Sequence, residues 1–153
     1  MIDMRSLNLG SAQLAVAAAV EAGRAKNRKI ALVVVDKFGD LLACARMDGL
    51  AGRYVKAAHR KAYTAAVFER DTLGLMAWWK ENEALGHQGP HDWNDPMLTT
   101  LPGGFVVVHE DQVVGGIGNS GGANGTPGLE DVDFAEIALA ALGPGFRHRL
   151  DWS

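Results

Sequence analysis

Apolar residues recur every three to four positions in two long stretches of the chain, which is the spacing of one face of an α-helix. The first stretch runs from about residue 9 to 26, with Asn8 placed to cap it. The second, RYVKAAHRKAYTAAVFER (53–70), sets His59 on its apolar face and Lys61 away from that face. It is apolar on more than one side. We therefore expect this helix to be sandwiched between its own sheet and either a lid or another subunit.

Two pairs of short apolar runs predict two antiparallel hairpins. IALVVV (30–35) and LLACAR (41–46) are joined by DKFGD, which has the composition of a tight turn. Residues 105–109 and 112–118 form the second pair, turning at Glu110 and Asp111. Each short connection requires its strands to run in opposite directions.

Two further helices are expected. LGLMAWWKENEA follows Asp71 and Thr72, either of which can cap it, and the last helix is expected to be capped by Thr126. Helices do not alternate one-for-one with strands, so the pattern predicts an α+β fold. We expect a single domain over residues 1–153, with a mainly antiparallel sheet and helices on its faces.

The composition of the chain limits the kinds of binding partner that we expect. The net charge is −3 and no basic run is present, so a nucleic-acid partner is not expected. Cys44 is the only cysteine, which excludes an internal disulfide and a cysteine-based zinc finger. The start of the sequence does not resemble a signal peptide, and no apolar run reaches membrane-spanning length. We expect a cytoplasmic protein with no membrane partner.

The segment LGHQGPHDWNDP (85–96) gathers unusual chemistry. It holds His87 and His91 four positions apart, with Asp92 and Asp95 close behind. Gln88-Gly89-Pro90 prevents the regular helix that would align the two imidazoles on a metal, so no metal is expected. The segment is interpreted either as a lid that contacts a ligand or as a purely structural loop. Nearby tryptophans (Trp78, Trp79 and Trp93) favour an apolar pocket wall.

Other candidate residues lie on the second helix and in the glycine-rich stretch 115–122. His59 fits either a core histidine or a pocket acid or base, and Lys61 either a solvated face or, beside Tyr63, a carboxylate-binding group. The stretch contains G-x-G-x-x-G, but no helix follows it, so a dinucleotide site is not expected. The backbone amides of Asn119, Ser120 and Gly121 could instead cradle an anion.

Several motifs taken together resemble the GlcG/HbpS family, which is related to the C-terminal domain of PduO-type adenosyltransferases. The matching residues are Val34-Val35-Asp36, Gly39, Arg46-Met47-Asp48, Lys61-Ala62-Tyr63-Thr64-Ala65, Pro102-Gly103-Gly104 and Gly115 through Gly121. The resemblance covers nearly the whole chain. The chain departs from the family at Asn119, where valine is usual, and in residues 85–96, which are longer and richer in His, Asp and Trp.

The resemblance implies a three-layer, profilin-like α/β/α domain around a five-stranded antiparallel sheet. The residue pattern gives four strands, so we expect the fifth near Met97 to Leu101 or absorbed into a loop. The resemblance also implies a homo-oligomer, from dimer to octamer, and a heme or other tetrapyrrole ligand, with heme as the candidate cofactor. It assigns no heme-ligating residue.

Three functions remain open. The first is an oligomeric small-molecule-binding protein. Its pocket would lie between the Lys61 helix, residues 85–96 and residues 115–122, with Lys61, Tyr63, Trp93, Asn119, Ser120 and Gly121 as ligand-binding residues. The second is a cofactor-free catabolic enzyme acting on a small carboxylate or aromatic substrate, with His87, His91 or His59 as general acid or base. The third is a structural or interaction protein without a small-molecule site.

Overall fold

The computed structural model describes residues 1–122 and 125–152, without the side chains of residues 90 and 91. The elements in chain order are α1 (Leu9–Ala25), β1 (Ala31–Asp36), β2 (Leu41–Arg46), α2 (Arg53–Phe68), α3 (Leu75–Glu83), α4 (Pro90–Trp93), β3 (Gly104–His109), β4 (Gln112–Ser120), α5 (Asp131–Ala140) and β5 (Phe146–Arg147). The strands pair in the order β2-β1-β4-β3-β5, and every pairing is antiparallel. The predicted α+β fold is confirmed.

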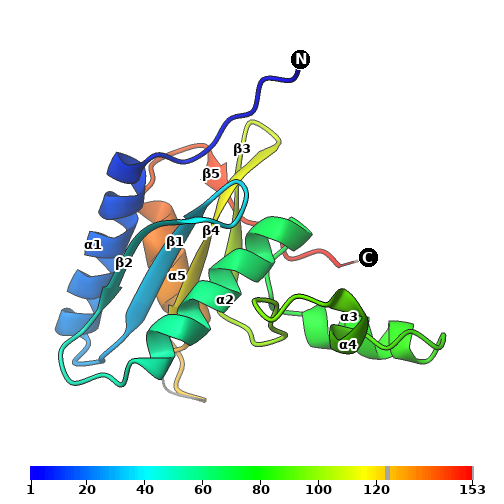
Figure 1. Ribbon diagram of the computed structural model, residues 1–153. Helices are drawn as coiled ribbons and strands as arrows, with labels where there is room; N and C mark the ends of the chain where they lie inside the picture. The colour runs from blue at the N-terminus through cyan, green and yellow to red at the C-terminus, as the bar shows by residue number, and fades with distance from the viewer. Residues whose placement is uncertain (123–124, 153) are drawn as a thin grey trace.

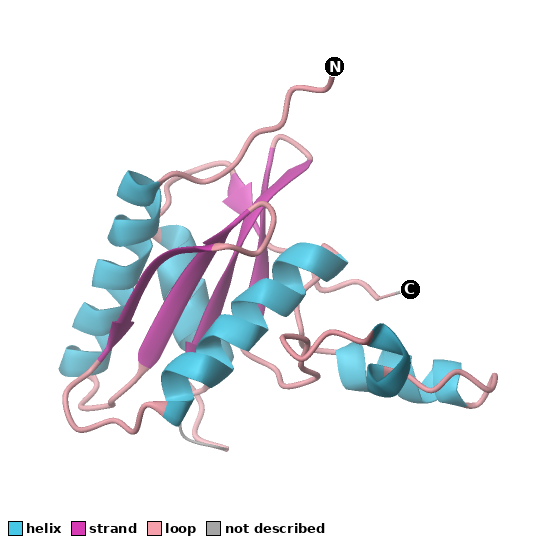
Figure 2. Cartoon of the chain, viewed as in Figure 1, coloured by secondary structure: helices cyan, strands magenta, loops and turns pink. Residues whose placement is uncertain are grey.

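The sheet is covered on both faces. Helix α2 crosses one face, while α1 and α5 lie side by side on the other (Figure 1), so the molecule has three layers (Figure 2). The central strand β1 is therefore buried throughout its apolar run, as its continuous valines predicted.

Glycines of β4 let the backbone of α2 lie directly on the backbone of the sheet. A Cβ atom at Gly118 would stand 2.0 Å from the carbonyl oxygen of Ala58, and one at Gly116 would stand 2.3 Å from that of Ala62. Such contacts are far below van der Waals separation, so a side chain at either position would push the helix away. The glycine-rich stretch up to residue 120 is thus a strand that packs under α2, two residues longer than predicted.

The opposite face holds the larger core. Phe134 of α5 packs with Leu32, Ile117 and Phe105, and the alanines of α1 allow that helix to come close. Asn8 caps α1, since its side-chain oxygen accepts a hydrogen bond from the amide of Ser11, as predicted.

Two predicted boundaries are wrong. The fifth strand is the two-residue β5, which pairs Arg147 with Val108, and not the segment near residues 97–101. Helix α5 begins at Asp131 rather than after Thr126, because Glu130 and Asp133 form a capping box four residues further on. The open edge of β3 pairs with the C-terminal tail that carries β5.

The segment that leaves the body after α2 forms an arm, defined here as residues 73–94. It contains α3 and α4 and projects from the side of the sandwich (Figure 1). Neither Asp71 nor Thr72 caps α3, contrary to the prediction: their side chains accept hydrogen bonds from the amides of Val106 and Gly104. These bonds tie the base of the arm to β3. Among the described residues, no helix is long and apolar enough to cross a membrane.

Candidate functional site

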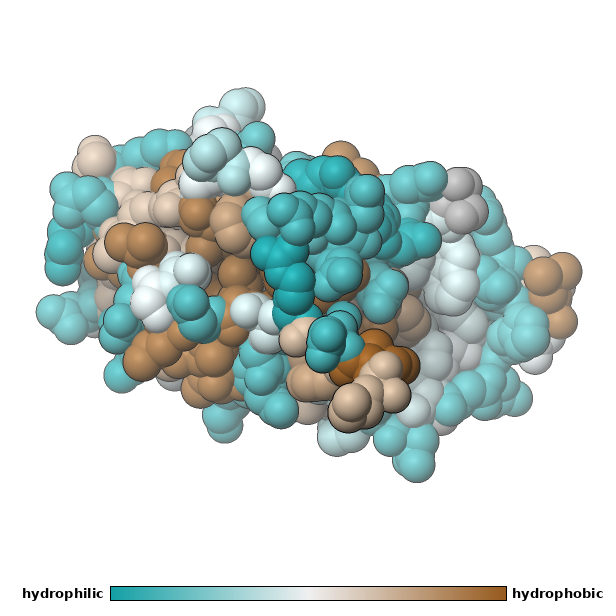
Figure 3. Space-filling view, turned by 90° about the horizontal axis from the view of Figure 1, so that it is seen from above, coloured by the Kyte–Doolittle hydropathy of each residue, from teal (hydrophilic) through white to brown (hydrophobic). Residues whose placement is uncertain are grey.

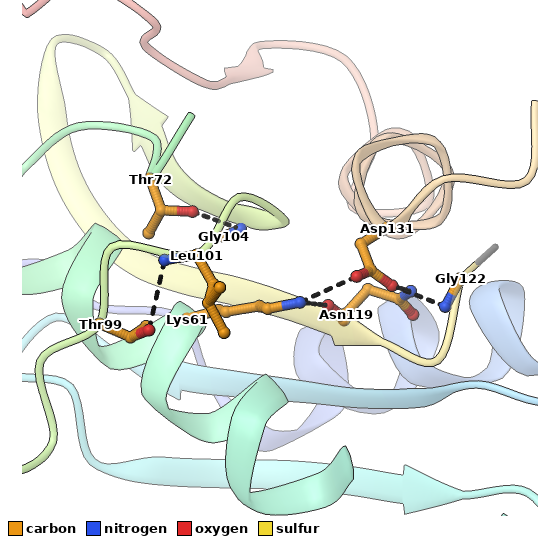
Figure 4. Close-up of polar contacts among 8 residues, drawn as sticks. All are labelled: Lys61, Thr72, Thr99, Leu101, Gly104, Asn119, Gly122 and Asp131. Carbon is orange, nitrogen blue, oxygen red and sulfur yellow. Dashed lines mark hydrogen bonds and ion pairs between the residues drawn. The ribbon is translucent and has the colours of Figure 1, made fainter. Parts of the chain in front are cut away.

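Lys61 is buried, although the helical pattern placed it away from the apolar face. Its Nζ atom donates hydrogen bonds to the carbonyl oxygen of Asn119 and to Oδ2 of Asp131, both at 2.9 Å. Figure 4 shows the side chain extended past the start of β3 toward these partners, with Leu101 beside it. A Cβ atom at Gly103 would lie 3.2 Å from Nζ, so glycine leaves room for this passage. The lysine therefore links α2 to α5 around the end of β3.

The predicted anion cradle is occupied by the protein itself. The amide of Asn119 donates to the carbonyl oxygen of Gly103 (3.0 Å), and Ser120 pairs with Ala31 in the sheet. The side chain of Asn119 donates to Oδ1 of Asp131, which also accepts a bond from the amide of Gly122 (Figure 4). Asn119 Oδ1 is buried without a hydrogen-bond partner among the described residues. The arrangement is a closed network around Asp131.

Tyr63 lies on α2 and connects the body to the end of the arm. Its hydroxyl donates to Oδ2 of Asp95 at 2.6 Å, and this bond, together with burial, raises the pKa of Tyr63. Its ring covers Gly39 in the β1–β2 turn, where a Cβ would lie 2.5 Å from the ring. His59, on the same helix, is partly exposed. Its role as an acid or base stays a prediction.

The arm forms a cavity of about 320 Å³ that is open to solvent. Its lining consists of Trp78, Trp79, Asn82, His87, Gly89, Asp92 and Trp93. Phe68 at the end of α2 packs against Trp93 (ring centroids 5.2 Å apart) and Trp78 (6.5 Å), and so fixes the cavity to the body. The sequence indicated this apolar wall from the tryptophans, but it gave no sign of Phe68 as their support.

The three parts of the predicted pocket do not line this cavity together. His87 and Trp93 line it, whereas Lys61, Tyr63 and the residues of β4 do not. The side chain of His91 lies outside the described residues. The predicted catalytic roles of His87 and His91 stay predictions.

A different groove runs between α1 and β2, and the sequence pattern did not indicate it. One part, of about 650 Å³, is lined mostly by apolar residues: Leu9, Val16, Ala17, Val20, Leu42 and Ala43, with Gln13, Glu21, Arg24 and Cys44. Seen from above, apolar surface gathers on the side where α1 and β2 lie, and the surface toward the arm is mostly polar (Figure 3). The groove exists because β2 is an edge strand that α1 covers only in part.

The same groove continues into a basic part of about 480 Å³. Its lining residues include four that carry cationic side chains, Arg24, Arg28, Lys29 and Arg46, and one that carries a carboxylate, Asp48. The guanidinium of Arg46 donates a hydrogen bond to the carbonyl oxygen of Leu50 at 2.7 Å. Val20 and Arg24 line both parts, so the two cavities adjoin. Arg28 Nε is buried with no hydrogen-bond partner among the described residues. A buried, unpaired guanidinium nitrogen is costly, and an anionic ligand group would satisfy it.

The C-terminal tail is held by a buried carboxylate. Asp71 is fully buried and accepts a bond from the amide of Val106, while its other oxygen contacts Nδ1 of His148. Burial raises the pKa of Asp71, and the hydrogen bond to Asp71 raises the pKa of His148. The imidazole also stacks on Phe105, with ring centroids 4.1 Å apart. This pair joins the tail, the base of the arm and β3.

No group of three or more His, Cys, Asp or Glu side chains in the described part of the chain is placed to hold a metal ion. The chemistry of heme fits the α1–β2 groove in part. The apolar wall suits a macrocycle and the arginines suit propionates, but no imidazole of the described residues lines the groove. Cys44 pairs with Val33, which packs under α2, so strand alternation turns the thiol to the other face of the sheet.

Comparison with known proteins gives consistent matches. Residues 7–140 match the family model described as haem degrading protein HbpS-like. Protein GlcG of Escherichia coli K12 is 33% identical over 105 residues, which cover 69% of this chain and 74% of GlcG.

Solved structures show the same fold. A double mutant of HbpS from Streptomyces reticuli superposes with a TM-score of 0.75 at 31% identity, over 94% of this chain and 91% of that one. The PduOC:heme complex gives a TM-score of 0.76 at 26% identity, over 89% of this chain and 94% of the other. PduOC, in that structure, holds heme.

Proposed function

This chain belongs to the HbpS-like family, and from that premise we propose that it binds an apolar, carboxylate-bearing small molecule of the heme type in the groove between α1 and β2. One observation carries the proposal: an apolar cavity adjoins a basic cavity, and Val20 and Arg24 line both. A ligand with an apolar body and anionic ends would use both parts at once.

The size and charge of the groove support this ligand class. Small-molecule pockets typically measure about 300–1,000 Å³ and combine apolar walls with a few polar groups. Arginine binds carboxylates through two parallel hydrogen bonds, which makes it well suited to propionate groups. Val16, Val20 and Leu42 would contact the macrocycle.

The described lining of this groove offers no imidazole to the iron of a bound heme. Met47 lines the basic part, but its sulfur accepts a hydrogen bond from the amide of Ile30, and the thiol of Cys44 is turned to the other face of the sheet. Affinity would then come from the apolar ring and the propionates rather than from a metal–ligand bond. An iron-free porphyrin with the same propionates should therefore bind nearly as well as heme does.

The test compares hemin with protoporphyrin IX. We expect both to give saturable absorbance changes, with dissociation constants that differ by less than about a factor of ten (1.4 kcal/mol). Saturable binding of hemin without binding of protoporphyrin IX would show that an iron ligand dominates and would refute the groove. Replacing His59, His87 and His91 together by alanine should leave both affinities unchanged.

The proposal includes self-association, which the family resemblance implies. Several apolar side chains are left exposed on the isolated chain, including Leu14 on α1, Leu41 on β2 and Met76 on α3. Burial of such residues against a second copy would favour an oligomer. Sedimentation velocity measures the state directly, and a monomer at all concentrations would refute this part of the proposal.

A further inference from the structure

The arm cavity is walled by three of the four tryptophans of the chain. The ring centroids of Trp79 and Trp93 are 6.3 Å apart and their planes meet at 74°, so the two indoles stand as adjoining walls. Trp78 forms part of the same lining. Behind it lies Trp152, the fourth tryptophan, with ring centroids 5.3 Å apart. The walls are thus fixed from outside the cavity.

The tight packing at Gly89 shows that the wall formed by Trp79 is close-fitting. A Cβ atom at Gly89 would lie 2.1 Å from atoms of the Trp79 ring, and the residue has a positive φ of 59°. Both conditions require glycine. The indole therefore lies directly on the backbone of the loop.

The charge of the cavity is negative. Asp92 lines it. The backbone amide of Gln88 holds this carboxylate in place by donating a hydrogen bond to Oδ2 at 2.7 Å. Among the described residues, the lining of the cavity includes no lysine or arginine. The whole arm (73–94) carries one lysine against three carboxylates, those of Glu81, Glu83 and Asp92. An anion would be repelled here, and a cation would be attracted.

We propose that this cavity binds a small organic cation of the quaternary or methylated ammonium class. The faces of aromatic rings carry negative potential and attract such cations, with tryptophan the strongest of the three aromatic residues. An alkylammonium group needs polarisable apolar contacts and one counter-charge. The indole walls of the cavity supply the contacts, and the carboxylate of Asp92 supplies the charge. A volume of about 320 Å³ suits a ligand of this small size.

This site is separate from the groove of the proposed function. The two share no lining residue, and they favour ligands of opposite charge. An experiment that refutes one proposal therefore does not refute the other.

The experiment uses choline and its carbon isostere, in which a tert-butyl group replaces the trimethylammonium group. Binding to the full-length chain is followed by tryptophan fluorescence and by calorimetry at about pH 8. We expect saturable binding of choline, and binding of the isostere that is at least about tenfold weaker, because only choline carries the charge.

Three variants place the binding in the cavity. Trp93→Leu removes one wall, and Asp92→Asn removes the charge while its side-chain oxygen can still accept the bond from the amide of Gln88. Each should weaken choline binding by about tenfold or more. Glu83→Gln is the matched control, since it removes a carboxylate of the same arm at a residue that does not line the cavity. It should bind choline as the wild type does.

The proposal is overturned by absence of saturable choline binding, by equal affinity for choline and its isostere, or by unchanged affinity in Asp92→Asn. Equal affinity would mean that the cavity is simply apolar. Near-ultraviolet circular dichroism verifies that the tryptophan cluster of each variant remains ordered. Should Trp93→Leu lose that order, the affinities of Asp92→Asn for choline and of the wild type for the isostere still decide between the outcomes.

Discussion

The groove between α1 and β2 and the cavity of the arm both have apolar walls, yet their charges are opposite. Four cationic side chains line the basic part of the groove, and Asp92 lines the arm cavity without any lysine or arginine. The groove lies on the sheet and its helices, whereas the cavity lies in a segment that projects from them. One chain of net charge −3 thus has two pockets with linings of opposite charge, and both proposals rest on charge, more than shape, as what selects the ligand.

The largest effect is expected where the body is held together. Lys61→Met should lower the free energy of unfolding by about 3 kcal/mol, because it leaves the Asp131 carboxylate without its cationic partner. Urea denaturation measures the loss. Lys56→Met, at an exposed lysine of the same helix, is the control and should cost little. Equal stability of the two variants would contradict a structural role for Lys61.

The second prediction separates the arm from the body. Phe68→Ala removes the ring that contacts both Trp78 and Trp93, and it should cost about 2 kcal/mol, less than a fully buried phenylalanine because the ring is partly exposed. Choline binding should disappear while protoporphyrin IX still binds. Loss of both ligands together would show that the two sites are not independent.

The third prediction reverses the charge of the groove. Arg24→Glu combined with Arg46→Glu should weaken protoporphyrin IX binding by about tenfold or more, since two carboxylate-binding groups become repulsive. Fluorescence titration measures the change. Arg60→Glu, on a helix that covers the other face of the sheet, alters the net charge without touching the groove and should bind the porphyrin normally.

The smallest effect concerns pH. The pKa of His148 is raised in the fold by its bond to Asp71, so this contribution to stability is present at low pH and is lost as the pH rises through the raised value. Each unit of elevation is worth about 1.4 kcal/mol. Unfolding free energies measured from pH 6 to 9 should fall more steeply in the wild type than in His148→Gln. Parallel curves would show that the pair does not titrate in this way.

The local pattern of apolar and polar residues was sufficient to predict most of the helices and strands. The valine-rich β1, the hairpin turns and the capped α1 each follow from residues close together in the sequence, and all were predicted. The family resemblance added the layer arrangement and the number of strands. The short β5 was missed because only its pairing with β3, far earlier in the chain, makes two residues a strand.

The sites were harder to predict. A lysine on an amphipathic helix normally lies in solvent, and Lys61 is buried only because α5 brings Asp131 to it. The α1–β2 groove combines arginines from a helix, a turn and a strand, a grouping that appears only after folding. The tryptophans of the arm were noticed in the sequence, but their orientation depends on Phe68 and Trp152. The glycine-rich stretch was noticed as well, but the close approach of Gly116 and Gly118 to the backbone of α2 appears only in the folded chain.

The most direct test of two sites with opposite charge is one titration series with protoporphyrin IX. It compares the wild type, the Arg24→Glu/Arg46→Glu variant and Trp93→Leu under identical conditions. If the porphyrin binds in the basic groove, only the double arginine variant loses affinity and Trp93→Leu matches the wild type. Loss of porphyrin binding in Trp93→Leu, with full binding by the arginine variant, would contradict this assignment.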